Sequence, residues 1–91
     1  MNDHPFYEIS EWDGSVPSFS IGDFVKLRFE GYSPQTDETE AEGMWVKVTD
    51  AGDEPKGTLA NDPAWLPMEF GDVVFFSRSQ VRRVEVSHVK S

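Results

Sequence analysis

Apolar side chains alternate with other side chains over two stretches of this chain. Residues 44–49 have the sequence MWVKVT, so that the methionine and both valines fall on one side of an extended chain. Residues 24–30 repeat the pattern, with Val25, Leu27 and Phe29 on one side. Both stretches are therefore predicted to be strands with one face in the core and the other facing water.

Three shorter strands complete the predicted set. Residues 57–60 follow a charged loop that contains two glycines and a proline, which is typical of a hairpin. Residues 72–77 contain the run VVFF, which is apolar on both faces and is predicted to be the most buried strand. Residues 82–86 alternate again, after a short polar turn over 77–81.

This order of strands predicts a mainly β protein, a small five-stranded SH3-like barrel with a partly ordered N-terminal extension. The alternative is an open antiparallel meander, whose exposed strand edges would need cover. The side chains predicted to fill the interior are Val25, Leu27, Phe29, Met44, Val46, Val48, Leu59, Val73, Phe75, Val84 and Val86.

The chain divides into an N-terminal extension (1–20), one barrel domain (21–87) and a frayed tail (88–91). The extension contains aromatic residues that disordered tails usually lack, so part of it is expected to pack on the barrel. Residues 7–9 are suited to a short extra strand. The dipeptides at 22–23 and 71–72 are both Gly-Asp before a strand, which indicates the same turn chemistry used twice.

Residues 31–43 (GYSPQTDETEAEG) are predicted to form a loop, with at most one frayed helical turn over 36–41. The loop is acidic, and it is either a solvated segment or a dedicated binding loop. Its four acids are Asp37, Glu38, Glu40 and Glu42.

The net charge of −9 changes the picture of possible partners. An acidic field repels phosphate backbones and attracts basic surfaces, which argues against nucleic acid as the main partner. The chain has no cysteine, and the sequence shows neither a signal peptide nor an apolar run of membrane-spanning length. A cytoplasmic protein is expected, as a monomer or weak dimer.

Three segments together resemble the YegJ-like family of small bacterial domains of unknown function. They are 43–48 (GMWVKV), 57–63 (GTLANDP) and 71–75 (GDVVF). The apolar-x-Asp-Trp ending of that family is replaced here by VRRV at 81–84. The resemblance implies a bacterial or phage origin and no established activity.

Catalytic and metal chemistry find little support in the sequence. The only histidines, His4 and His88, lie near the two ends of the chain without a partner at triad or ligand spacing. The acids at 50–54 lack the remaining ligands of a calcium loop and are followed by Pro55. The chain is therefore predicted not to be an enzyme and to hold no cofactor and no metal.

Two tryptophans are candidates for binding, and the sequence leaves the role of each open. Trp65 lies in the proline-bounded loop 61–65, where it is either an interface anchor or a plug over one end of the barrel. Trp45 is either a lid under the N-terminal segment or a surface anchor.

We expect a non-enzymatic, acidic protein-interaction module that binds a basic protein surface. An inhibitor, an immunity-type protein or a phage-encoded modulator would be concrete versions of it. The predicted partner-binding residues are Trp65, Asn61, Asp62, Asp37, Glu38, Glu40 and Glu42. The alternative is single-stranded nucleic-acid binding through aromatic residues and the basic cluster of Arg78, Arg82 and Arg83, unless these arginines pair with the protein's own acids.

Overall fold

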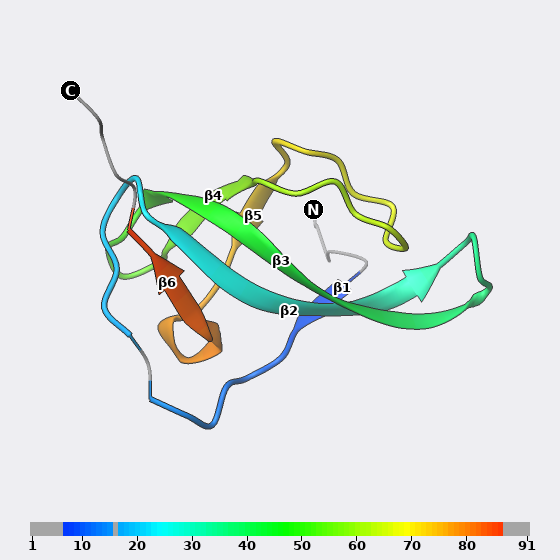
Figure 1. Cartoon of the computed structure of the whole chain (residues 1–91), viewed down its shortest axis with the longest axis horizontal. Helices are drawn as coiled ribbons and strands as arrows, with labels where there is room; N and C mark the ends of the chain where they lie inside the picture. Colours follow the sequence, from blue (N-terminus) through cyan, green and yellow to red (C-terminus); the bar gives the residue numbers. More distant parts are fainter. Residues whose placement is uncertain (1–6, 16, 87–91) are drawn as a thin grey trace.

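The computed structural model describes residues 7–15 and 17–86, and they form one antiparallel sheet (Figure 1). The strands follow one another in the order β1-β2-β3-β4-β5, and β6 pairs with β2. A 3-10 helix, η1, comes directly before β6. The elements are β1 (Tyr7–Ile9), β2 (Phe24–Ser33), β3 (Glu38–Asp50), β4 (Lys56–Leu59), β5 (Val73–Phe75), η1 (Arg78–Gln80) and β6 (Arg83–Glu85).

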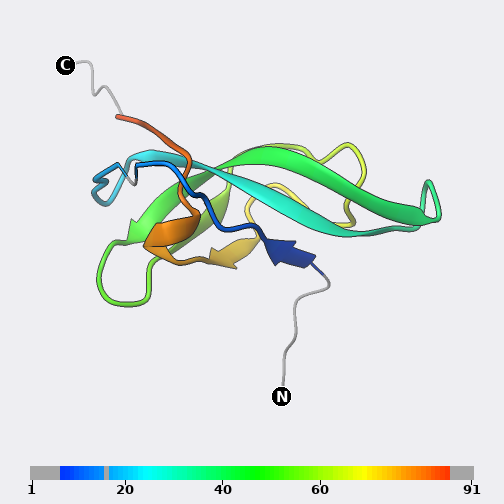
Figure 2. The same ribbon diagram turned by 90° about the horizontal axis from the view of Figure 1, so that it is seen from below.

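The sheet is an open, curled half-barrel. Strand β2 is long enough to pair with β3 along one edge and with both β1 and β6 along the other, where β1 lies opposite 29–31 and β6 opposite 24–26. Among the described residues no ladder joins β5 to β1 or β6. Figure 2 shows the sheet from below, with η1 beside the N-terminal segment. The predicted mainly β fold is confirmed, and the half-barrel agrees with a barrel-like sheet and with the meander alternative.

The core occupies the inner face of the sheet and confirms most of the predicted interior. Seven of the predicted residues are buried: Val25, Leu27, Phe29, Met44, Val46, Val48 and Leu59. Val84 is partly buried against them, whereas Val73, Phe75 and Val86 are exposed. Six further buried residues are outside the predicted interior: Phe19, Leu66, Met68, Val74, Phe76 and Val81.

The prediction that 72–77 is the most buried strand is wrong. β5 is the last strand on the β1–β5 path and pairs only with β4. Val74 is fully buried, but its neighbours Val73 and Phe75 are 59% and 61% exposed. A run that is apolar on both faces does not specify which face is buried, and here the neighbouring strand decides it: Val74 lies opposite the buried Gly57 of β4.

A turn with Gly22 at its third position leads the chain into β2. The amide of Asp23 donates to the carbonyl of Ser20 (3.0 Å), and its carboxylate accepts from the Ser20 amide (3.0 Å). Gly22 adopts a φ of 97°, which is readily accessible to glycine. Gly22 N–H then donates to Val48 C=O and Val48 N–H to Asp23 C=O, both at 2.8 Å, so two residues face one across the ladder.

The same arrangement leads the chain into β5, which confirms the prediction that one turn chemistry is used twice. Gly71 has a φ of 94°, and the Asp72 carboxylate accepts from the Glu69 amide (2.9 Å). Gly71 N–H donates to Leu59 C=O and Leu59 N–H to Asp72 C=O, again at 2.8 Å each. Each Gly-Asp pair therefore fixes where its strand begins on a neighbouring strand.

The prediction of an acidic loop over 31–43 is wrong, and so is the helical turn over 36–41. β2 continues to Ser33 and β3 begins at Glu38, so only 34–37 form the tip of a long hairpin. Figure 1 shows this hairpin projecting from the rest of the sheet. The register explains why the charges do not prevent pairing, because Glu38, Glu40 and Glu42 lie opposite the uncharged Ser33, Gly31 and Phe29.

The predicted packing of the N-terminal extension is confirmed for the residues that the structure describes. Tyr7 and Ile9 pack against the core, and the Tyr7 and Phe29 rings meet edge to face with centroids 5.2 Å apart. The side chain of Gln80 ties η1 to β1, because its Nε2 donates to the Ile9 carbonyl (3.0 Å) and its Oε1 accepts from the Ser77 amide (2.8 Å).

The adjacent valines of β5 provide a test of which face is buried. We expect Val74→Ala to lower the free energy of unfolding by about 2 kcal/mol, because it removes two buried methyl groups and leaves a cavity. Val73→Ala removes the same atoms from an exposed position and should change it by less than about 0.5 kcal/mol. Urea unfolding followed by tryptophan fluorescence measures both, and equal losses would contradict the assigned phase of β5.

Candidate protein-binding surface

The distal half of the β2–β3 hairpin carries three glutamates on one face of β3. Glu38, Glu40 and Glu42 alternate with Thr39, Ala41 and Gly43, and they continue the face on which Met44 is buried. β4 pairs with β3 only over 46–50, and nearer the hairpin tip the loop 60–70 contacts the hairpin instead. The hairpin and this loop together make the surface on which most of the predicted binding residues lie.

Glu42 holds the loop to the hairpin by accepting three consecutive backbone N–H groups. Its Oε1 accepts from Ala64 (2.9 Å), and its Oε2 accepts from Trp65 (2.7 Å) and Leu66 (2.8 Å). Convergent amides of this kind form a concavity that suits an anion, and hydrogen bonds to a charged group are the stronger ones. Glu42 is thus a structural anchor whose carboxylate is engaged by the loop, and its predicted role in partner binding stays a prediction.

Asn61 also has a structural role at the start of the loop. Its Oδ1 accepts a hydrogen bond from the backbone N–H of Trp45, and the adjacent Ala60 N–H donates to the Trp45 carbonyl (2.9 Å). Farther along, Gln35 at the hairpin tip donates through Nε2 to the Ala64 carbonyl (3.3 Å). The loop is therefore fixed to β3 at its beginning. Near its middle it is fixed both to β3 and to the hairpin tip.

These anchors leave Trp65 on the outside. Its side chain is 42% exposed, whereas Leu66 and Met68 are buried in the core. The role of a plug, which was one of the two interpretations for Trp65, belongs to Leu66 and Met68. Trp65 is instead available as an anchor for a partner, since large aromatic side chains are enriched among interface hot spots.

All seven predicted residues lie on the hairpin and its loop, and five of them remain when the anchors Glu42 and Asn61 are set aside. Tyr32, which the sequence offers only as a ring for stacking bases, adds an exposed side chain at the hairpin tip. The side chains of Glu38, Glu40 and Asp62 have no hydrogen-bond or ion-pair partner among the described residues. We call this set the hairpin–loop surface: Tyr32, Asp37, Glu38, Glu40, Asp62 and Trp65.

Charge on this surface has one sign. The segments that build it, 29–46 and 57–77, contain eight acids and neither lysine nor arginine. The Arg28–Glu30 contact is the one ion pair between residues that the structure describes. The negative potential of the hairpin–loop surface is therefore not neutralised by basic side chains within its own segments.

At the hairpin tip the Tyr32 hydroxyl donates a hydrogen bond to Asp37, whose φ of 58° lies in the left-handed region. This hydrogen bond raises the pKa of Tyr32 above its ordinary value, because ionisation would break it and place a phenolate beside a carboxylate. The contact joins the two sides of the hairpin tip and places the exposed Tyr32 side chain beside Asp37.

The three arginines of the alternative hypothesis do not form one cluster. Arg78 lies over the Phe19 ring, with its guanidinium carbon 4.7 Å from the ring centre, and it also donates to the Ala51 carbonyl. Arg82 lies over the Trp12 ring at 4.8 Å, and Arg83 is exposed on β6. Within 7–15 and 17–86 none of the three pairs with an acid, and Arg78 and Arg82 contact aromatic rings instead.

Trp45 is half-buried and lines a hollow together with Phe24, Ala60 and Glu85. Of the two roles considered for Trp45, a lid under the N-terminal segment is not supported by β1, which lies opposite 29–31 and not opposite Lys26, the partner of Trp45. Within 7–15 and 17–86 no group of three or more His, Asp or Glu side chains is placed to hold a metal ion. In the same ranges no helix is both long and apolar enough to cross a membrane.

Comparisons of this chain with models of known families, with curated proteins and with solved structures find no match. The resemblance to the YegJ-like family therefore stays a prediction from the three sequence segments. What the structure itself defines is a class: a small, acidic, mainly β half-barrel with a projecting hairpin and one loop clamped to it.

Glu42 and Glu40 provide a matched pair of substitutions. Glu42→Gln leaves one acceptor oxygen and no charge for three amides, so we expect a loss of about 1–3 kcal/mol in the free energy of unfolding. Hydrogen exchange at the amides of Ala64, Trp65 and Leu66 should accelerate as well. Glu40→Gln should change neither quantity beyond about 0.5 kcal/mol. Unchanged exchange at the three amides in Glu42→Gln would contradict the anchoring role.

The Tyr32 contact predicts a pH effect of known sign. A raised folded-state pKa means that the hydrogen bond is present below the unfolded value of about 10 and is lost as the pH rises through the folded value. In a Tyr7→Phe background, which leaves Tyr32 as the only tyrosine, Asp37→Asn should lower the pKa measured by ultraviolet absorbance. Asp62→Asn is the control, and a pKa unaffected by Asp37→Asn would exclude the contact in solution.

Proposed function

We propose that this protein is a non-enzymatic protein-interaction module that binds a basic surface of a partner protein through the hairpin–loop surface. A cytoplasmic inhibitor, an immunity-type protein or a phage-encoded modulator fits this description. In each case the module would act by covering part of its target, so that the positions of its charges and of Trp65 matter more than any reactive group.

The observation that carries the proposal is the clamp formed by Glu42. The Glu42 carboxylate accepts three amide hydrogen bonds from one loop, and they fix residues 64–66 against the hairpin. The clamp presents an exposed tryptophan from a restrained backbone. A side chain already held in its binding position loses less conformational entropy on association, which favours affinity.

The free acids supply the second part of the argument. Glu38, Glu40 and Asp62 extend from the same surface without partners among the described residues, so they are available to a basic protein. Charges at the rim of an interface mainly accelerate association and set specificity, whereas a central aromatic residue contributes more to the lifetime of the complex. The hairpin–loop surface contains both kinds of group.

Affinity capture from a cell lysate tests the proposal. We expect the wild-type protein, immobilised through its C-terminus, to retain at low salt a basic protein that is released at high salt. Trp65→Ala should lose it. The triple variant Glu38→Gln, Glu40→Gln and Asp62→Asn should bind the purified partner with an association rate reduced about tenfold or more.

A second triple variant provides a matched control. Asp13→Asn, Asp53→Asn and Glu54→Gln remove the same net charge from exposed positions outside the hairpin–loop surface. This control should retain the partner with little change in association rate. If both triple variants behave alike, net charge and not the hairpin–loop surface governs binding, and a partner whose capture is insensitive to salt would also contradict the proposal.

A further inference from the structure

The outer face of the sheet, which points away from the core, carries a second pattern of side chains. On β2 and β3 each aromatic residue of this face lies opposite a basic residue of the other strand: Lys26 opposite Trp45, and Phe24 opposite Lys47. On the other side of β2, Arg83 of β6 lies opposite Lys26. Directly opposed side chains are about 5 Å apart at Cβ, so rings and cations are interleaved at close range.

Basic residues are concentrated on this face. All three lysines that the structure describes lie on it, and so do two of the four described arginines, Arg28 and Arg83. Among the strand residues of this face four are acidic, Glu8, Glu30, Asp50 and Glu85, and Asp50 lies opposite Lys56 of β4. A protein with a net charge of −9 thus places most of its described cations on one side of one sheet.

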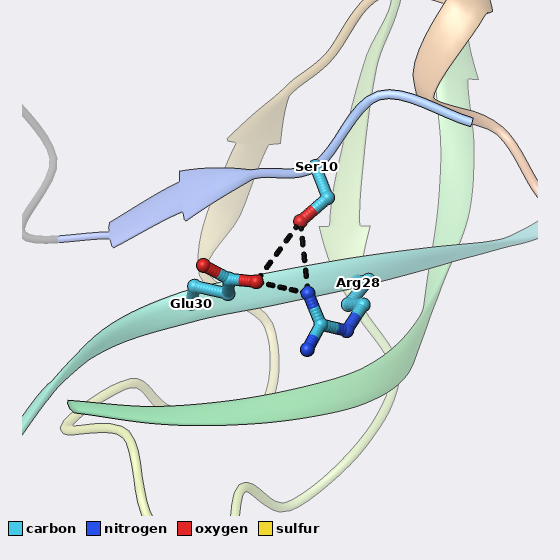
Figure 3. A network of polar contacts seen from close by, with 3 residues as sticks. All are labelled: Ser10, Arg28 and Glu30. Carbon is cyan, nitrogen blue, oxygen red and sulfur yellow. Dashed lines mark hydrogen bonds and ion pairs between the residues drawn. The ribbon is translucent and has the colours of Figure 1, made fainter. Parts of the chain in front are cut away.

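Arg28 does not add to the free positive charge. Its guanidinium forms an ion pair with Glu30, and its Nη1 donates to the Ser10 hydroxyl (3.2 Å), as Figure 3 shows. Lys26, Lys47 and Arg83, in contrast, have no ion-pair partner among the described residues. These three cations surround the two aromatic rings.

The rings border an open hollow. Phe24, Trp45, Ala60 and Glu85 line a space of about 260 Å³, and the Lys26 ammonium lies 5.5 Å from the centre of the Trp45 ring. A hollow with flat apolar walls and cations at its margin suits a ligand that has a planar ring and a negatively charged group close to that ring. The Glu85 carboxylate can accept hydrogen bonds from exocyclic amino groups but repels phosphate.

We propose that the outer sheet face binds single-stranded nucleic acid, with unpaired bases against Phe24 and Trp45 and phosphates beside Lys26, Lys47 and Arg83. Base stacking on an aromatic side chain contributes about 1–3 kcal/mol per base without requiring a particular sequence. This site shares no residue with the hairpin–loop surface and differs from the arginine cluster considered from the sequence, of which only Arg83 belongs to it.

Two other polyanions fit the observations less well. In a duplex the bases are stacked on one another, so Phe24 and Trp45 would have no free base to contact. An acidic polypeptide would satisfy the three cations, but its carboxylates have no flat face to place against the rings. The combination of rings and cations therefore favours single strands over both.

Fluorescence anisotropy with a labelled oligothymidylate of roughly 15 nucleotides tests the proposal. We expect saturable binding at low salt, with the logarithm of the affinity falling by about 2 for each tenfold rise in salt if three phosphates are neutralised. Lys47→Gln, an exposed position on β3, should weaken binding several-fold and reduce that slope by about 0.7.

Matched variants separate this site from general charge effects. Lys56→Gln removes the same charge from β4, where the ammonium lies over the Phe75 ring at 5.7 Å, and should weaken binding by less than twofold. Glu85→Gln should strengthen binding, because it removes the carboxylate that repels phosphate. Glu38→Gln with Glu40→Gln should not weaken it, although that pair is expected to impair capture of the basic protein partner. Circular dichroism of each variant confirms that the sheet is intact.

Several results would overturn the proposal. The first is the absence of oligothymidylate binding at low salt. The second is that a nucleic-acid duplex or poly-glutamate binds as tightly as the oligothymidylate. The third is that Lys47→Gln and Lys56→Gln weaken binding equally. A further contrary result is concentration-dependent self-association that Lys47→Gln abolishes, since the outer face would then bind the acidic hairpin of a second copy. The other outcomes leave the test of the hairpin–loop surface unaffected, whereas self-association would make a second copy of this chain a partner of that surface.

Discussion

The ladder between β2 and β3 is the constraint on which the rest of the structure depends. Ten consecutive cross-strand pairs join the two strands, and their register assigns every side chain of both strands to the core or to the outside. A slip of one residue would exchange the two faces, so that Val25, Leu27 and Phe29 would meet water. The same register places Glu42 toward the loop and Trp45 toward the outer face, so both proposed surfaces follow from it.

The molecule separates charge between these surfaces to a degree that the total charge conceals. Acids without basic neighbours lie along the hairpin and its loop, while the free lysines lie on the outer face of the sheet. The two kinds of charge stay on separate surfaces because few of the cations form ion pairs with acids. Arg78 and Arg82 contact aromatic rings, and a single ion pair joins residues that the structure describes. One small domain can therefore repel an anion at long range through its net negative charge and attract it at short range through the cations of the outer face.

The local sequence patterns were sufficient for the strands with one apolar face and for the two Gly-Asp turns. Alternation at 24–30 and 44–49 is a short-range property, and glycine followed by aspartate has its effect within one turn. The hairpin was missed although its signal was present: glutamates at 38, 40 and 42 alternate with small or β-prone residues. The acidic composition there is typical of a loop, but charged side chains on an exposed face do not prevent strand pairing.

The sequence by itself determined the mainly β class, most of the core and the acidic segments that form the hairpin–loop surface. Only the tertiary structure decided which side of β5 is buried, which acid is hydrogen-bonded to the loop as an anchor and which tryptophan is exposed. These features depend on partners far apart in the chain, such as Glu42 with the amides of residues 64–66. A carboxylate has the same local sequence whether it is solvated or surrounded by amides, and the difference arises only when the fold brings the amides to it.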